Sequence, residues 1–327
     1  LGFEDDVDLK KVNFYIFKDF ININERIKEV DKAFLIDLRS AVYKKYTTCW
    51  FQNYGAIIVK LQHKPTILST WSPSLKDYLI ILRNIIINDG LNRATISKVY
   101  GYCYRHFFER KKVDCCDIKV CSGNVTQSNN GEFEIRSHSY DYDIYLKDKR
   151  KKINSKEYIV FLEDGMVHHP DYEKLGISPR ASGEIYFPLL RSFFNKVEEK
   201  TGLPIKVAVH PRLIIDENMN KNFGKRELTS GKSAELVKNA KLVLVHNSTA
   251  INFAVLWGIP LLVVTTDEVE RSLYPQLEAI TQILKTSRIN MNNSYENIDF
   301  LETAQEPIPQ YNHYVEKIIK MNNSSNQ

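Results

Sequence analysis

Three short groups of polar residues in the second half of the chain could together carry out group transfer. The groups are Glu163, Asp164 and Gly165; His210 and Pro211; and Asn247, Ser248 and Thr249. A carboxylate can take the proton of an attacking hydroxyl, which is typically worth about 10²–10⁴-fold in rate. A protonated imidazole can donate a charge-assisted hydrogen bond to a phosphate oxygen, and this bond strengthens as a leaving phosphate gains charge. The set therefore favours transfer of a sugar from a nucleotide, with no metal needed to neutralise the leaving group.

The elements that must position these groups are short apolar runs that alternate with helical stretches. The expected strands span residues 158–162, 205–209, 242–245 and 261–264, and the expected helices span 185–200, 233–240 and about 248–257. This alternation predicts a parallel sheet with crossover helices, whose strands are apolar because both faces are buried. Ligands of such sheets bind at the carboxyl ends of the strands. Each polar group follows the end of one expected strand, so we expect all three at one edge.

Each group taken alone also has a purely structural interpretation. An acidic pair after a strand is often a turn with a helix cap. A His-Pro pair commonly starts a loop, and Ser248 with Thr249 would make a good helix N-cap. The joint placement at three strand ends favours a site, because a helix N-terminus at Ser248 and Thr249 would suit a phosphate.

The three groups, in this order, resemble the acidic-acidic-Gly, His-Pro and Ser/Thr motifs of bacterial sialyltransferases with the GT-B fold, which include lipooligosaccharide and capsular polysialic acid enzymes. The resemblance covers about residues 157–266, and residues 242–265 also look like a broader group of surface-carbohydrate glycosyltransferases. It implies an inverting, metal-independent transfer of sialic acid or a related nonulosonic acid. The implied partners are a CMP-activated donor and a surface glycan acceptor, without a cofactor.

The resemblance also implies roles for individual residues. Asp164 matches the general base and Glu163 its acidic neighbour, and which of the two is the base stays open. His210 matches the residue that meets the donor phosphate. The remaining implied nucleotide-binding residues are Pro211, Ser248, Thr249, Asn247 and Gly165.

The expected fold is α/β and GT-B-like, with two Rossmann-like domains whose parallel sheets face a central cleft. The expected domains are an acceptor-side domain at 1–152, a nucleotide-sugar-binding domain at 153–303, and a C-terminal helix with a frayed tail at 304–327. In the first domain we expect strands at 12–17, 32–37 and 55–59, a helix at 75–87, a loop at 122–134 and a basic linker at 147–152. A further helix is expected at 311–321.

Composition excludes several classes of protein. The 327 residues are 43% hydrophobic and 26% charged, which is typical of a globular chain, and the net charge of +5 is too mild to argue for nucleic acid. Gly258 and Pro260 interrupt the longest apolar run, so no membrane-spanning helix is expected. Five cysteines make a poor disulfide framework, and the adjacent pair Cys115 and Cys116 is unsuited to one zinc ion. We expect a cytoplasmic protein, with peripheral contact at the inner face of the membrane as an option.

Several alternatives remain open on the sequence. The donor could be CMP-Kdo or another nucleotide-activated sugar or polyol. The chain could instead be a non-catalytic nucleotide- or glycan-binding component of a capsule assembly complex, or, ranked last, a nucleotide-sugar epimerase. Additional candidates for the cleft are the histidines His168, His169 and His246 and the cations Arg212, Arg226 and Lys232.

Overall fold

A computed structural model describes residues 34–37, 57–62, 71–90, 95–96, 99–100, 116–123, 131–150, 157–175, 177–304 and 308–321. The chain divides into two compact units. The first comprises Leu1–Leu61, Val113–Lys119 and Asn129–Glu134, and the second comprises Gln62–Lys112, Val120–Ser128 and Ile135–Gln327. Within the described ranges, no helix combines the length and apolar character that crossing a membrane requires.

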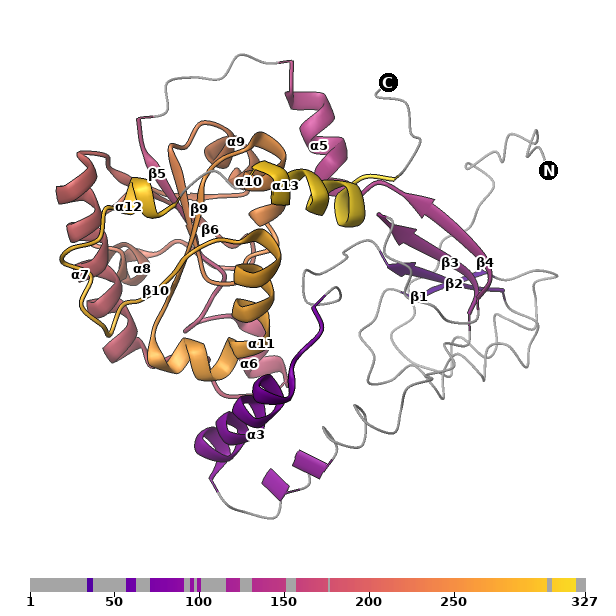
Figure 1. Cartoon of the computed structure of the whole chain (residues 1–327), viewed down its shortest axis with the longest axis horizontal. Coiled ribbons are helices and arrows are strands. Elements are labelled where there is room, and N and C mark those ends of the chain that lie inside the picture. Colours follow the sequence, from indigo (N-terminus) through magenta and orange to yellow (C-terminus); the bar gives the residue numbers. More distant parts are fainter. Residues whose placement is uncertain are drawn as a thin grey trace. The chain divides into compact units, whose positions relative to one another are not determined.

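A four-stranded sheet is built from the first half of the chain, in the order β1-β2-β3-β4 (Figure 1). Its strands are β1 (Phe34–Asp37), β2 (Ile57–Gln62), β3 (Cys116–Ser122) and β4 (Gly131–Ser137), and β1 pairs parallel with β2. The expected strands at 32–37 and 55–59 are confirmed, whereas 12–17 lies outside the described residues. The expected loop at 122–134 is wrong for 131–134, because Phe133 and Ile135 alternate with polar residues at the two-residue period of a strand.

The second unit contains a six-stranded parallel sheet in the order β10-β9-β8-β5-β6-β7. Its strands are β5 (Ile159–Leu162), β6 (Ile205–Val209), β7 (Leu228–Ser230), β8 (Leu242–Val245), β9 (Leu261–Thr265) and β10 (Arg288–Asn290). β5, β8 and β9 are buried along their whole length. The predicted α/β class with an apolar parallel sheet is therefore confirmed.

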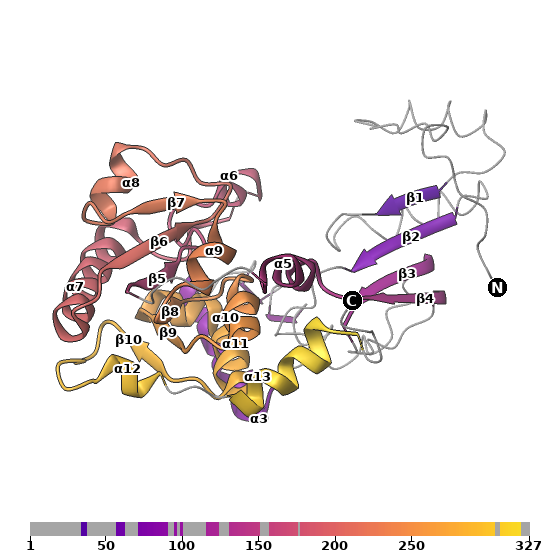
Figure 2. The ribbon, with the colours of Figure 1, turned by 90° about the horizontal axis from the view of Figure 1, so that it is seen from above.

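Helices cover both faces of this sheet (Figure 2). On one face lie α7 (Gly183–Thr201), α8 (Glu217–Asn222) and α12 (Phe300–Thr303); on the other lie α9 (Ser233–Lys238), α10 (Ile251–Trp257), α11 (Asp267–Leu284) and α13 (Ile308–Tyr314). A short α6 (Pro170–Leu175) follows β5, and a π-helical turn at Val315–Ile319 continues α13. The expected helices at 185–200, 233–240 and 311–321 are confirmed in position.

Aromatic side chains fill the space between the sheet and α7. Phe161 on β5 meets Phe194 edge-on, with ring centroids 5.1 Å apart, and Phe223 lies 6.4 Å from Phe161. Buried aromatic rings supply much apolar area each, and edge-to-face pairs add to it. This packing fixes the direction in which β5 delivers the residues that follow it.

Two helices that precede residue 150 pack within this second unit. In α3 (Leu75–Asp89), Asp77 accepts a 2.8 Å hydrogen bond from the Tyr274 hydroxyl of α11. In α5 (Tyr140–Asp148), Asp141 accepts a 2.7 Å bond from the Asn252 amide of α10. The expected basic linker is thus helical at 147–148, and the expected boundary between 152 and 153 lies outside the described residues and stays a prediction.

Candidate functional site

The strands that precede the three polar groups are neighbours in the sheet. β5 lies between β8 and β6, and Leu162, the last residue of β5, is in register with Val245 and Ala208. The backbone N–H of Glu163 extends this pairing by donating a 3.0 Å hydrogen bond to the Ala208 carbonyl. The three groups therefore begin at one edge of the sheet, as the sequence predicts.

Glu163 is buried directly beneath this edge. Its Oε1 accepts a 2.7 Å hydrogen bond from the Gly165 N–H, whereas its Oε2 is buried and has no hydrogen-bond partner among the described residues. Burial raises the pKa of Glu163 to about 8, and the neighbouring Asp164 adds to the rise. The backbone N–H groups of Gly165 and Met166 oppose it. Glu163 therefore retains its proton at neutral pH, which makes it a poor candidate for the base.

Asp164 has a different environment, although it is adjacent in sequence. Its Oδ2 accepts a 3.1 Å hydrogen bond from the backbone N–H of Asn247, which ties the first polar group to the third. Its Oδ1 is buried and lacks a partner in the described part of the chain. Burial raises the pKa of Asp164 to about 6, while the Asn247 N–H and the positive charge of Arg180 lower it. Asp164 is therefore mostly ionised at neutral pH and can accept a proton.

Gly165 lets the chain turn sharply after the acidic pair. Its φ is +77°, and a Cβ built there would lie 2.9 Å from the Cβ of His169. Only glycine adopts this conformation without strain. The turn brings His169 back over the sheet edge, where its ring lies 5.0 Å from the ring of His210.

His210 stands at the end of β6 with a defined orientation. Its Nδ1 accepts a 3.2 Å hydrogen bond from the Arg212 N–H, so the neutral ring carries its proton on Nε2. The Arg212 guanidinium donates 3.0 and 3.2 Å hydrogen bonds to the two oxygens of Asp171. The neighbouring Pro211 is exposed. Asp171 also contacts His169: its backbone N–H donates a 3.2 Å hydrogen bond to His169 Nδ1, and its Oδ2 lies 3.5 Å from the same nitrogen.

The third group differs from the predicted helix cap. The helix α10 begins at Ile251, its N-cap is Ala250, and no side chain caps it. Ser248 Oγ instead accepts a 3.3 Å hydrogen bond from the Ala250 N–H. A serine hydroxyl that accepts a hydrogen bond from the backbone N–H two residues later stabilises a local turn, and this turn competes with helix formation. Ser248 and Thr249 thus form a hydroxyl-bearing turn before the helix, half-buried and exposed respectively.

The other expected cleft histidines have separate roles. His246 is fully buried, donates from Nδ1 to the Val264 carbonyl and accepts at Nε2 a 2.7 Å bond from the Tyr186 hydroxyl. Burial lowers the pKa of His246 to about 4, so its ring is neutral. His246 therefore contributes no charge at the sheet edge. His168 is exposed and stacks at 5.8 Å on Phe187.

The candidate cations also differ in their surroundings. Arg226 forms a 2.6 Å ion pair with Glu198 of α7 and is therefore structural, and Lys232 is exposed before α9. Arg180, which lies 16 residues after Asp164 in a segment without a motif, is the cation that acts on Asp164. Sequence reasoning missed it because nothing in residues 176–182 marks a functional position. Within the described ranges, no group of three His, Cys, Asp or Glu side chains lies close enough together to hold a metal ion. This does not test the reaction itself, and metal independence stays a prediction.

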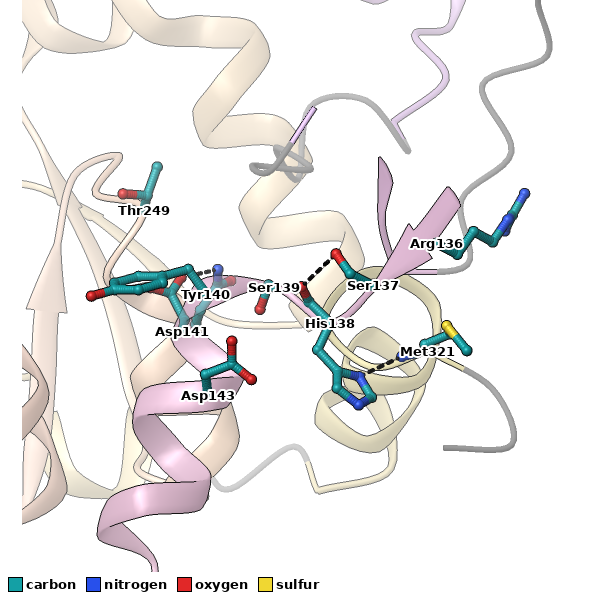
Figure 3. Close-up of a pocket in the computed structure, with 10 residues that line it drawn as sticks. Arg136, Ser137, His138, Ser139, Tyr140, Asp141, Asp143, Thr249 and Met321 are labelled. Atoms are coloured by element: carbon teal, nitrogen blue, oxygen red, sulfur yellow. Dashed lines mark hydrogen bonds between the residues drawn. The ribbon is translucent and has the colours of Figure 1, made fainter. Parts of the chain in front are cut away.

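A pocket of about 610 Å³ opens beside Thr249 (Figure 3). Apart from Thr249, its lining comes from the end of β4, the first turn of α5, α10 and the end of the described chain; these residues are Arg136, Ser137, His138, Ser139, Tyr140, Asp141, Asp143, Asn252 and Met321. None of them was expected to be functional, because they come from four segments that only folding brings together. Thr249 is the residue that the pocket shares with the predicted site.

No family model matches the sequence, and no curated protein matches it. Among solved structures, the chain is similar to the glycotransferase of kitacinnamycin, at 9% identity and a TM-score of 0.41 over 83% of this chain and 68% of that one. It is similar to the spinosyn rhamnosyltransferase SpnG at 9% identity and a TM-score of 0.41, over 88% and 97% of the two chains. It is also similar to S. aureus MnaA in a co-structure with UDP, at 14% identity and a TM-score of 0.39, over 90% and 77%.

Proposed function

We propose that this chain is a GT-B glycosyltransferase that transfers a sugar from a nucleotide-activated donor to a glycan hydroxyl. The observation that carries the proposal is the meeting of three groups at one sheet edge. Asp164 is hydrogen-bonded to Asn247, and His169 brings the acidic loop against His210. Among the described residues, Asp164 has a buried carboxylate oxygen without a hydrogen-bond partner, and His210 has an oriented imidazole at the end of the neighbouring strand β6. Such a combination is typical of a catalytic site.

The proposed reaction follows from these positions. The acceptor hydroxyl oxygen attacks the anomeric carbon, and its proton passes to the Asp164 carboxylate. The bond from the anomeric carbon to the phosphate oxygen breaks, and its electron pair leaves with the nucleotide. His210 donates a hydrogen bond from Nε2 to a phosphate oxygen, and the hydroxyls of Ser248 and Thr249 donate to others. Because these bonds strengthen as charge develops on the phosphate, they favour the transition state.

The proposed donor is a CMP-activated nonulosonic acid, and the proposed transfer is inverting and metal-independent. This choice is supported by the three-motif order described from the sequence, with Asp164 rather than Glu163 as the base. Glu163 is not chosen as the base because its burial keeps its carboxyl group protonated at neutral pH. Arg180, whose positive charge acts on Asp164, is proposed to hold that base in its ionised form.

The test is glycosyl transfer measured with a panel of CMP-, CDP-, UDP- and GDP-activated sugars, in the presence and absence of EDTA. We expect transfer from a CMP-activated nonulosonic acid, with turnover reduced at least about 100-fold in Asp164→Ala and in His210→Ala. Wild-type turnover in both variants would refute the assigned roles. A preference for UDP or GDP donors would keep the reaction class and replace the donor.

A further inference from the structure

The pocket beside Thr249 has preformed walls. The Asn252 amide donates to Asp141 at 2.7 Å and its carbonyl oxygen accepts from the Tyr314 hydroxyl at 2.9 Å. On the opposite wall, the Met321 N–H donates to His138 Nδ1 at 3.0 Å. Walls held by such bonds do not have to be ordered by a ligand, which lowers the entropic cost of binding.

Three residues that line this pocket have polar side-chain groups without a hydrogen-bond partner in the described ranges. They are the hydroxyls of Tyr140 and Thr249 and the carboxylate of Asp143. Tyr140 is a large aromatic residue that is 69% exposed, so much of its side chain is accessible to a ligand. In Figure 3 the Tyr140 ring lies between Thr249 and Asp143.

The charges of the lining indicate which part of a ligand fits. Asp141 and Asp143 both contribute carboxylates, and Arg136 lies at the far end of the pocket from Thr249 (Figure 3). A phosphate placed near Tyr140 would meet the negative charge of Asp143. A neutral, hydroxyl-rich ring would not, because a carboxylate accepts hydrogen bonds from adjacent hydroxyls and an aromatic face packs on the apolar face of a sugar.

We propose that this pocket binds a sugar ring through its adjacent hydroxyls, with the ring on Tyr140 and the hydroxyls donating to Asp143. A volume of about 610 Å³ is that of a small-molecule site. The inference rests on the proposed function for the choice of ligands, since the ring is either the ribose of the donor nucleotide or a sugar of the acceptor glycan. Thr249 at the rim links the bound ring to the turn that is proposed to hold the phosphate.

The test is calorimetric titration of the full chain with CMP, with 2′,3′-dideoxy-CMP and with lactose as a probe saccharide. The variants are Asp143→Asn, Tyr140→Ala and Tyr140→Phe, and the matched control is Glu217→Gln, an exposed acid in the first turn of α8. We expect Asp143→Asn and Tyr140→Ala to weaken one ligand about tenfold, which is the worth of one charge-assisted hydrogen bond or one stacked ring. Tyr140→Phe keeps the ring and is expected to retain most of the affinity.

The pattern of weakened binding identifies whether the pocket holds the donor ribose or an acceptor sugar. Weaker CMP binding in Asp143→Asn, together with equally weak binding of dideoxy-CMP by the wild type, assigns the pocket to the ribose. Weaker lactose binding with unchanged CMP binding assigns it to the acceptor. Unchanged binding of both ligands in Asp143→Asn and Tyr140→Ala, or no binding of either ligand by the wild type, overturns the inference.

The outcome is separable from that of the proposed function. If CMP binding is weakened by His210→Ala, and the pocket variants weaken neither CMP nor lactose binding, the pocket inference falls and the proposed function stands. If the chain transfers no sugar from any donor and still binds CMP or lactose through Tyr140 and Asp143, the proposed function falls and the pocket inference stands.

Discussion

At the scale of single residues, two adjacent carboxyl groups have different acid–base properties. Asp164 has a pKa of about 6 and Glu163 a pKa of about 8, because Glu163 is more deeply enclosed and faces the charge of its neighbour. Carboxyl groups whose environments separate their pKa values take different roles. Asp164 is the group whose charge changes near neutral pH, so it should control activity.

The pH dependence of turnover tests this assignment. Because the base must be ionised, turnover should fall about tenfold per pH unit below the Asp164 pKa of about 6. Asp164→Asn should reduce turnover about 10²–10⁴-fold and abolish this acidic limb. Asp299→Asn serves as the control, since it keeps a good N-cap for α12. An acidic limb that persists in Asp164→Asn would show that another group is the base.

Glu163 should affect stability rather than turnover. Its pKa is about 8 in the folded chain against 4.5 for a free glutamate side chain, so the unfolded chain ionises first. The contribution of Glu163 to the free energy of unfolding is therefore complete below about pH 4.5 and is lost as pH rises toward 8, by about 1 kcal/mol per pH unit at most.

Urea unfolding of the wild type and Glu163→Gln at pH 5 and pH 8 measures this contribution. We expect the variant to gain stability relative to the wild type as pH rises, because glutamine has no proton to lose. Glu217→Gln, exposed on α8, should show no such trend. An equal difference between wild type and Glu163→Gln at both pH values would contradict the raised pKa.

At the scale of elements, Gly165 determines how the segment after β5 reaches the site. Gly165→Ala places a residue with a side chain at φ +77° and pushes a Cβ to 2.9 Å from the His169 Cβ. We expect a loss of about 1–3 kcal/mol in the free energy of unfolding and reduced turnover, because Asp164 and His169 must shift.

Gly231→Ala is the matched control. Gly231 has a similar φ of +74°, but a Cβ there would meet nothing within 4 Å. Gly231→Ala should therefore lower the free energy of unfolding only through the strain of a positive φ at alanine, and it should keep normal turnover. Equal effects of the two substitutions on turnover would mean that the contact with His169 does not position the site.

The sequence predicted those elements whose residues carry a strong local pattern. β5, β8 and β9 are continuous apolar runs, and their order in the chain was enough to place the polar groups at one edge. β7 and β10 were not predicted because each has three residues and is only partly buried. Ser248 and Thr249 were expected to cap a helix, but the Ser248 hydroxyl bonds its own turn instead.

The candidate site was predictable only in part, because only some of its residues belong to a strong local sequence pattern. Glu163, Asp164 and His210 follow strand ends and could be named from sequence. Arg180 and the Tyr186–His246 hydrogen bond depend on contacts between distant segments, which no local pattern encodes. The pocket beside Thr249 was even less predictable from the sequence, because residues near 140 and 321 come together only in the folded unit.

At the scale of the whole molecule, the unit that contains the six-stranded sheet depends on helices from earlier in the chain. Lys238 of α9 is almost fully buried, and its ammonium group lies 3.2 Å from Oδ2 of Asp148 at the end of α5. It also donates a 2.8 Å hydrogen bond to the Asp148 carbonyl. A buried charge needs such partners, so α5 is part of this unit rather than of a separate linker.

Removal of the Asp148 carboxylate should therefore destabilise the unit. We expect Asp148→Asn to lower the free energy of unfolding by about 3 kcal/mol, because the buried ammonium group of Lys238 loses the negative charge of the Asp148 carboxylate. Asp143→Asn, exposed on the same helix, should leave it unchanged. Urea titration followed by tryptophan fluorescence measures both. Equal stability of the two variants would show that α5 contributes no such pairing.

The central claim, that Asp164, His210 and the Ser248–Thr249 turn converge on one nucleotide-binding edge, is tested most directly by a crystal structure with CMP. We expect a phosphate within hydrogen-bond distance of His210 Nε2 and of the Ser248 or Thr249 hydroxyl, with the Asp164 carboxylate facing the position that the sugar would take. A phosphate bound elsewhere on the chain, or Asp164 and His210 turned away from it, would contradict this claim.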